Sequence, residues 1–159
     1  MKSDAPPIGS DATPELVFER LFNAPAKSVF RAWTDPTRLV QWWGPHGFRT
    51  TIESMDVRVG GTWSYVLHGP DGVQYPNTAV FEVLEPPHRL VFHNTGGHVE
   101  DKHLTCRMVV TFAEVRGQTQ VTLRMQFRSI AQLESAKQRG AVEGGRQSFE
   151  RLKTLLLRN

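Results

Sequence analysis

The sequence predicts an α+β fold in which a curved antiparallel sheet packs against an amphipathic helix at the end of the chain. Between residues 51 and 127, apolar residues alternate with polar or small ones in segments separated by turn residues, as in half-buried strands. Beyond them, Phe149, Leu152, Leu155 and Leu156 recur at helical spacing. That apolar stripe can be buried only on the concave face of the sheet.

Composition favours one domain of ordinary globular type. The chain has 159 residues, of which 39% are hydrophobic and 22% charged. The formal net charge is +3 without a cluster of Lys and Arg, so we expect no nucleic-acid partner. No apolar run is long enough to span a membrane. The single cysteine, Cys106, excludes an internal disulfide, and we expect a small buried side chain in a cytoplasmic protein.

The first part of the chain predicts a tail, a strand and two helices. Residues 1–13 are polar and Pro-rich, which predicts a disordered tail before a domain over 14–159. A short strand over 16–22 follows, with apolar residues on both faces. Pro25 then marks the first turn of one helix, and Asp35 and Pro36 are the N-cap and first residue of a second. Gly44 ends that helix.

Six further strands and a long helix complete the prediction. The strands are expected over 51–59, 63–68, 73–84, 89–94, 104–112 and 121–127. Ser129 and Gln132 have the spacing of a capping box, which predicts a helix from there to Leu157. Three glycines, Gly140, Gly144 and Gly145, interrupt its pattern.

Two adjacent tryptophans, Trp42 and Trp43, stand where the helical pattern gives way to strands. Neighbours on a helix point roughly 100° apart, so the two indoles cannot face the same way. Trp43 continues the stripe from Leu39, which predicts a core residue, and Trp42 is expected at the rim of a cavity. We expect the corner at Trp42, Trp43, Gly44 and Pro45 to close one end of an apolar cavity.

Motifs along almost the whole chain resemble one protein family. They are Asn23-Ala24-Pro25, Val29 to Pro36, Gln41-Trp42-Trp43-Gly44-Pro45, Gly60-Gly61-Thr62-Trp63-Ser64-Tyr65, Gly69-Pro70-Asp71-Gly72, Pro86 to Phe92, and Gly144 to Leu152. From Leu16 to Leu156 the chain resembles the activator of Hsp90 ATPase homologue-like family, a branch of the START-like (SRPBCC) superfamily. The resemblance implies a helix-grip fold, with a cavity between a curved antiparallel sheet and a long C-terminal helix.

The same resemblance leaves function open. Members of the superfamily bind lipids, sterols or polyketides, or act as cyclases, and the eukaryotic relative assists a chaperone. The chain departs from the family pattern at one place, where Gly144-Gly145 stands in place of the frequent Gly-Trp. The missing indole either enlarges the cavity or leaves a gap that neighbouring side chains fill, and the sequence favours neither.

The candidate binding residues are aromatic and polar side chains around the expected cavity. Each aromatic residue taken alone is more often core than ligand site. As a group they fit a pocket with an apolar wall, in which Tyr65 and Tyr75 are the polar groups best able to bind a ligand. The complete set is Trp42, Trp43, Trp63, Tyr65, Tyr75, Asn77, Phe92, Arg107, Gly145 and Phe149.

The remaining residues predict no catalytic residues, metal or cofactor. His93, His98 and His103 are spaced by five across a Gly-rich loop, which matches no metal signature and predicts a solvated loop. Glu53 and Asp56 have an odd spacing on one strand and so face opposite sides. The sequence contains no nucleophile elbow, Walker loop or dinucleotide fingerprint.

Three functions follow from this reading. The first is a carrier or sensor of a small apolar or aromatic molecule. The second is a co-chaperone-like module that binds a chaperone, and the third is a cyclase-type enzyme acting on an aromatic or polyketide-like substrate. The exposed edges of the sheet would also allow a homodimer.

Overall fold

The computed structural model describes residues 13–96 and 105–158. Its elements, in chain order, are β1 (Glu15–Phe22), α1 (Ala26–Thr34), α2 (Pro36–Leu39), β2 (Arg49–Met55), β3 (Thr62–His68), β4 (Gln74–Glu85), β5 (Arg89–Gly96), β6 (Thr105–Val115), β7 (Gln118–Gln126), α3 (Ile130–Gln138) and α4 (Ala141–Leu157). This is the predicted order of one strand, two helices, six strands and a helical end.

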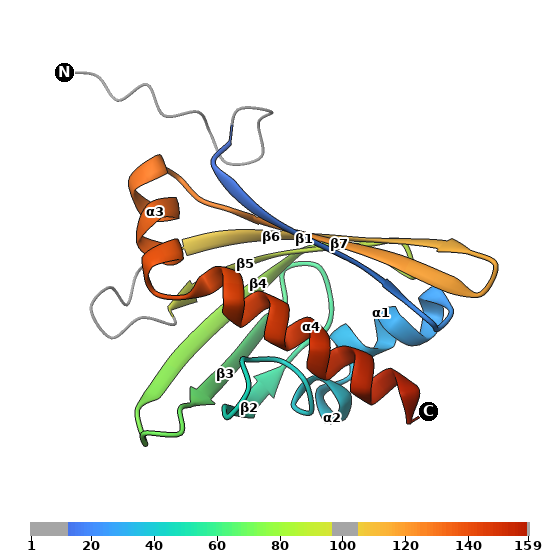
Figure 1. The fold of residues 1–159 in the computed structure, drawn as a ribbon, viewed down its shortest axis with the longest axis horizontal. Coiled ribbons are helices and arrows are strands. Elements are labelled where there is room, and N and C mark those ends of the chain that lie inside the picture. Colours follow the sequence, from blue (N-terminus) through green and yellow to red (C-terminus); the bar gives the residue numbers. More distant parts are fainter. Residues whose placement is uncertain (1–12, 97–104, 159) are drawn as a thin grey trace.

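The strands form one antiparallel sheet in the order β1-β7-β6-β5-β4-β3-β2. Six consecutive strands therefore make a meander, and β1 joins it beside the last of them, with Glu15 opposite Gln126 and Phe22 opposite Thr119. The sheet curves around α4, which crosses its concave face, while α1 and α2 lie near the far end of that helix (Figure 1). The α+β fold is thus confirmed.

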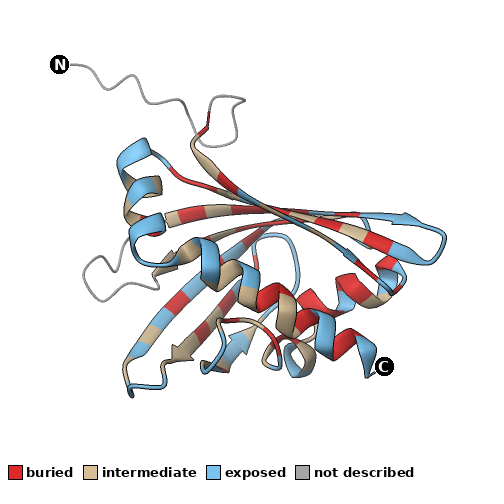
Figure 2. Cartoon of the chain, in the orientation of Figure 1, coloured by how far each residue is buried: buried red, intermediate tan, exposed pale blue. Residues whose placement is uncertain are grey.

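Side-chain alternation along the strands separates an inner from an outer face. Met108 lies opposite Met125 and Val110 opposite Leu123, and all four point toward α4 or the space beneath it. Residues between them point to the outer face. Buried residues accordingly alternate with exposed ones along the strands (Figure 2).

The helical pair after β1 forms as its sequence predicts. The side chain of Asp35 accepts a hydrogen bond from the backbone N–H of Thr37 at 3.0 Å, and Pro36 occupies the first helical position. One face of α1 is buried, with the Phe30 ring 5.2 Å from that of Phe112 on β6. Helix α1 therefore packs against the sheet at β6.

The predicted single helix at the end of the chain is divided into two. Ser129 Oγ accepts from the N–H of Gln132 at 3.1 Å, which confirms the N-cap of α3. The Gln132 side chain, however, accepts from the N–H of Arg128 rather than from that of Ser129. Gly140 then adopts φ 87°, and a left-handed residue at this point ends α3 before α4 begins in a new direction.

Two other predicted boundaries differ from the structure. The strand expected over 51–59 ends at Met55, because residues 56–61 turn back so that Gly60 and Gly61 exchange backbone hydrogen bonds with Phe81 on β4. Of the predicted tail over 1–13, residues 1–12 lie outside the described residues, whereas Thr13 is described and buried.

Two glycines of this region should respond oppositely to alanine. Gly140→Ala should lower the free energy of unfolding by about 1 kcal/mol, because an L side chain disfavours positive φ even where space is open. Gly144→Ala should raise it by up to about 1 kcal/mol, because Gly144 lies inside α4 and a Cβ there would meet only Pro45 Cγ at 3.4 Å. Urea unfolding checks both, and a shift of the same sign in the two variants would contradict the backbone assignment.

Candidate functional site

A cavity of about 580 Å³ lies between the concave face of the sheet and the first half of α4. Strands β3 to β7, the junction of α3 with α4, and the loop after α2 all contribute to its wall. Much of the wall is apolar, including Leu67, Met108, Leu123, Met125 and Phe127. A space of this size with an apolar wall is typical of a site for a small molecule.

Six of the ten sequence-predicted site residues line this cavity. They are Trp43, Tyr65, Tyr75, Asn77, Gly145 and Phe149. The other four, Trp42, Trp63, Phe92 and Arg107, do not line it.

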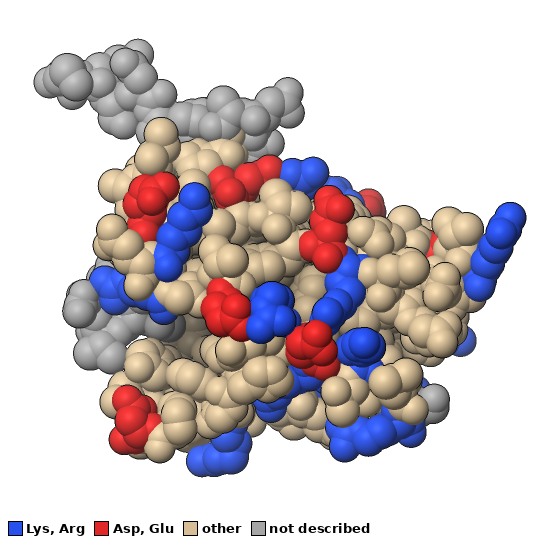
Figure 3. Space-filling view, viewed as in Figure 1, with Lys and Arg blue, Asp and Glu red and all other residues tan. Residues whose placement is uncertain are grey.

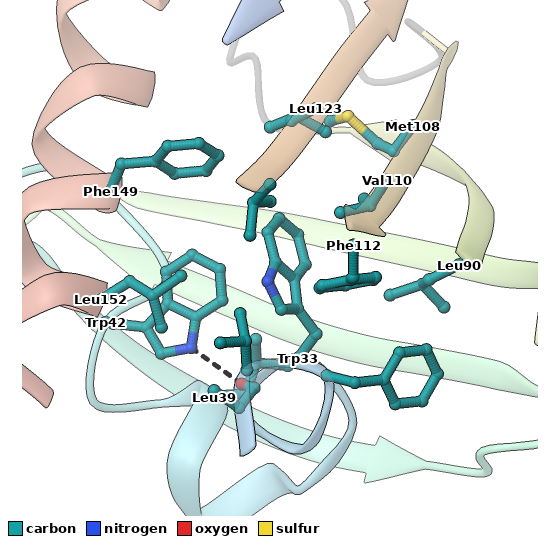
Figure 4. Packing of buried hydrophobic residues seen from close by; sticks show 14 of the residues in the cluster. Trp33, Leu39, Trp42, Leu90, Met108, Val110, Phe112, Leu123, Phe149 and Leu152 are labelled. Carbon is teal, nitrogen blue, oxygen red and sulfur yellow. Dashed lines mark hydrogen bonds between the residues drawn. The ribbon is translucent and has the colours of Figure 1, made fainter. Parts of the chain in front are cut away.

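The predicted division between the two adjacent tryptophans is wrong. Trp42 is the core residue: its side chain is fully buried, and its indole N–H donates to the carbonyl of Ala32 at 2.8 Å (Figure 4). Trp43 is half-buried and lines the cavity.

The reason is a change of helical winding after α2. The backbone N–H groups of Gln41 and Trp42 bond three residues back, to Arg38 and Leu39. Side chains three apart share a face in so tight a turn. Trp42 therefore lies with buried Leu39, and Trp43 turns toward the cavity.

Trp63 and Phe92 support the cavity wall from behind instead of forming it. Both are almost fully buried. The Trp63 ring stacks on Tyr65 with centroids 4.3 Å apart and meets Phe92 edge-on at 5.5 Å. These contacts fix the ring of Tyr65, which does line the cavity.

Arg107 lies on the outer face of the sheet, because it falls between the inward residues Cys106 and Met108. Its guanidinium pairs with Glu82 at 2.6 Å, and Glu82 also meets His93 at 2.7 Å. The hydrogen bond from Arg107, followed by that of His93, lowers the pKa of Glu82 from 4.5 to about 2. Arg107 thus stabilises the sheet from outside and does not reach the cavity.

Asn94 is a cavity residue that the sequence reading missed. It lies on β5, is buried, and accepts a hydrogen bond from the Tyr65 hydroxyl at 2.7 Å. Its amide nitrogen donates to Asn77 at 2.9 Å. The sequence contained the information needed to find Asn94. It lies two residues after Phe92 on the same strand, and alternate side chains of a strand share a face, here the inner one.

The space beside Gly145 is filled by a neighbouring ring. A Cβ on Gly145 would lie 2.4 Å from two ring atoms of Phe18 on β1. Phe18 therefore takes up room that a larger side chain would need here, which is the second of the two outcomes considered for this departure from the family pattern. The cavity nevertheless reaches both Gly144 and Gly145.

Side chains of α4 hold the loop after α2 against one end of the cavity. Arg151 donates to the carbonyls of Gly44 at 2.9 Å and Pro45 at 3.2 Å, and Ser148 Oγ accepts from the N–H of Gly44 at 3.2 Å. Burial lowers the pKa of Arg151. Trp43 and Pro45 of this loop line the cavity, so the loop closes the site where the sequence placed its corner.

The described residues contain no metal-binding cluster. In ranges 13–96 and 105–158, no three His, Cys, Asp or Glu side chains are grouped to hold an ion. The loop histidines His98 and His103 lie outside these ranges. Cys106 lines the cavity, and burial raises the pKa of its thiol to about 12, which keeps it protonated.

The surface charge and the lengths of the helices bear on two further partners, nucleic acid and a membrane. On the face seen in Figure 3, Lys and Arg side chains interleave with Asp and Glu. Nucleic-acid binding usually requires basic side chains gathered on one face. Among the described helices, none combines the length and apolar character needed to cross a bilayer.

A curved antiparallel sheet around a C-terminal helix, with a cavity between them, defines a helix-grip protein of the START-like class. Solved structures share the architecture. A protein from Arthrobacter aurescens matches with a TM-score of 0.86 and 25% identity over 96% of this chain and 91% of its own. One from Mycobacterium smegmatis matches with a TM-score of 0.81 and 25% identity over 96% of each chain. An AHSA1 protein from Silicibacter pomeroyi matches with a TM-score of 0.74, 22% identity, and coverage of 91% and 98%.

The family itself is shown by the sequence. The family described as Activator of Hsp90 ATPase homolog 1-like protein matches residues 23–157, and the chain belongs to it. A comparison with curated proteins found no significant match.

Substitutions of Trp42 and Trp43 should lower the free energy of unfolding by different amounts. Trp42→Phe should cost about 1–3 kcal/mol of unfolding free energy, because it leaves the buried Ala32 carbonyl without its donor. Trp43→Phe should cost less, since Trp43 is partly exposed and lines a cavity. Urea titrations measure the difference, and a larger loss for Trp43→Phe would reverse the assignment.

The ion pair between Glu82 and Arg107 on the outer face of the sheet should make the free energy of unfolding depend on pH in the acid range. The lowered pKa of Glu82 stabilises the fold above about pH 4.5, and this stabilisation is lost as pH falls toward about 2. Wild type should therefore lose more unfolding free energy over that window than Glu82→Gln. The excess should stay below about 1 kcal/mol, because the carboxylate is 37% exposed. Identical acid profiles would show that the pairing adds nothing.

Proposed function

We propose that this protein binds a small, mostly apolar molecule in the cavity between α4 and the sheet. The observation that carries the proposal is the cavity itself, about 580 Å³ beside a connected cluster of buried hydrophobic residues. Protein interiors are close-packed and leave few voids larger than a water molecule, so a cavity of this size favours a site for a ligand. The work of the protein would then be to carry or sense that molecule.

The chemistry of the wall supports an apolar ligand. Aromatic and aliphatic side chains from the sheet face Phe149 and the glycines of α4 across the space. Polar groups gather on one side, at Tyr65, Asn77 and Asn94. Apolar contact would supply affinity, and a few placed polar groups would supply orientation.

A cyclase-type enzyme has weaker support from this wall. Burial raises the pKa of the Tyr65 phenol, although its hydrogen bonds with Trp43 and Asn94 oppose that rise. The pKa of Cys106 is also raised. Both groups thus stay protonated and neutral near pH 7, whereas general acid–base catalysis works best with a group titrating near the working pH.

A co-chaperone role is supported by the description of the family, which names an activator of the Hsp90 ATPase. Members of one family and fold can serve different functions, so a shared family name argues less than a site does. None of the contacts described above distinguishes a chaperone-binding surface. The cytoplasmic location expected from the single cysteine, and the homodimer, stay predictions.

A neutral fluorescent probe tests the proposal. N-phenyl-1-naphthylamine should bind wild-type protein with an increase in its emission and a stoichiometry near one. Cys106→Phe, which places a ring in the cavity, should weaken that binding by about tenfold or more, because the added side chain takes the probe's space. Fluorescence titration and calorimetry measure both.

A matched variant controls for the added ring. Val115→Phe introduces the same side chain at an exposed site at the end of β6, away from the cavity wall, and should leave probe binding unchanged. Urea unfolding of both variants confirms that they are folded. Equal binding by wild type and Cys106→Phe, or no binding by wild type to this probe or to a lipid and aromatic panel in native mass spectrometry, would overturn the proposal.

A further inference from the structure

Three side chains on neighbouring strands form a connected polar group inside the cavity, here called the polar relay: Tyr65 on β3, Asn77 on β4 and Asn94 on β5. Tyr65 lies opposite Asn77, so sheet register brings two of the three together. All three are at least nine-tenths buried and all line the cavity. They stand among apolar side chains, where each unpaired polar atom is costly.

One backbone carbonyl sets the direction of every hydrogen bond in the polar relay. Asn77 Nδ2 bonds the carbonyl oxygen of Tyr75 at 2.8 Å, and a carbonyl can only accept. Asn77 must therefore present its Oδ1 to Asn94, which donates from Nδ2 at 2.9 Å. Asn94 in turn presents Oδ1 to the Tyr65 hydroxyl, which donates at 2.7 Å.

This direction decides which groups remain for a ligand. The single hydroxyl proton of Tyr65 is used within the polar relay. Each asparagine NH₂ group has two N–H bonds and uses one of them, so Asn77 and Asn94 each retain one donor. Among the described residues, no second partner accepts from either nitrogen. The polar relay thus offers the cavity two N–H donors from neutral amides.

The charge of the wall limits what those donors can bind. Among the described residues that line the cavity, the one Lys, Arg, Asp or Glu is Arg139, which is exposed at the junction of α3 and α4. The polar relay lies on the strands and contains no cation. A buried carboxylate there would lack a counter-charge, which is strongly unfavourable, whereas a neutral oxygen would not.

We propose that the polar relay selects ligands that carry a neutral oxygen acceptor, such as a ketone, ester or amide carbonyl, on an apolar body. The oxygen would accept from the second N–H of Asn94 or Asn77 while the rest of the molecule contacts the apolar wall. The inference rests on the proposed function, since it needs a ligand in the cavity. It names a chemical class that the apolar wall alone does not specify.

Three naphthalenes that differ in one substituent test the selection: 2-acetylnaphthalene, 2-ethylnaphthalene and 2-naphthoate. Wild type should bind the ketone about threefold to tenfold more tightly than the ethyl compound, the range for one additional hydrogen bond. The carboxylate should bind most weakly. Calorimetry gives the affinities, and the side-chain NH₂ resonances of Asn77 and Asn94 should shift with the ketone and not with the ethyl compound.

Two variants separate the asparagine donors from the tyrosine. Replacing Asn77 and Asn94 together by Leu in a Tyr65→Phe background should reduce the preference for the ketone to less than about twofold. Both donors are then lost at similar side-chain volume, and the Tyr65 proton that loss of Asn94 would release is absent. Tyr65→Phe should retain most of the preference, because the Tyr65 proton is used inside the polar relay. Should the variant without the two asparagines fail to fold, the NH₂ resonances of wild type still report the contact.

The possible outcomes distinguish the two proposals. Equal binding of the ketone and the ethyl compound overturns the selection while leaving cavity binding in place. Tightest binding of 2-naphthoate, loss of the preference in Tyr65→Phe, or retention of the preference once both asparagines are replaced in that background also overturns it. Binding of none of the three compounds overturns the selection, and cavity binding is overturned with it when N-phenyl-1-naphthylamine does not bind either.

Discussion

Burial of one face of α4 against the concave sheet is the interaction on which the rest of this structure depends. The second half of α4 packs closely against the sheet, with Leu152, Leu155 and Leu156 nearly or fully buried. Its first half carries Gly144 and Gly145 and stands over the cavity. A single helix therefore packs densely at one end, while at the other it borders the cavity through two residues without side chains, the space beside Gly145 being taken by the Phe18 ring.

The two faces of the sheet divide stability from recognition. On the outer face, Glu82 joins Arg107 and His93 across three strands, where water is present and each pair contributes modestly. On the inner face, Tyr65, Asn77 and Asn94 are removed from water, so their hydrogen bonds have fixed partners and a fixed direction. The same period-two alternation that builds the sheet thus also places the polar relay in the cavity.

Much of the fold was predictable because it follows from local patterns. Alternation gave the strands, the Asp35-Pro36 and Ser129 caps gave helix starts, and the stripe after Gly145 gave the face of α4. The site was predictable in part. Tyr65 and Asn77 were predicted in the cavity and line it. Asn94 was not predicted, and Arg107 was expected in the cavity but lies on the outer face. The alternation of side chains along β5 and β6 could have predicted both positions.

By itself, then, the sequence determined the order of elements, the apolar faces and the family, because periodicity, capping and turn residues act over a few positions. Only the tertiary structure decided which tryptophan is core, because a tighter turn after Leu39 rotated Trp42 inward. It alone decided that the Phe18 ring fills the space beside Gly145. It also decided the direction of the polar relay, because the Tyr75 carbonyl fixes the orientation of the Asn77 amide, which then pairs with Asn94 on β5 and through it with Tyr65 on β3. The contact of Phe18 with Gly145 and the hydrogen bonds of Asn94 with Asn77 and Tyr65 join residues far apart in the chain, and no local pattern encodes them.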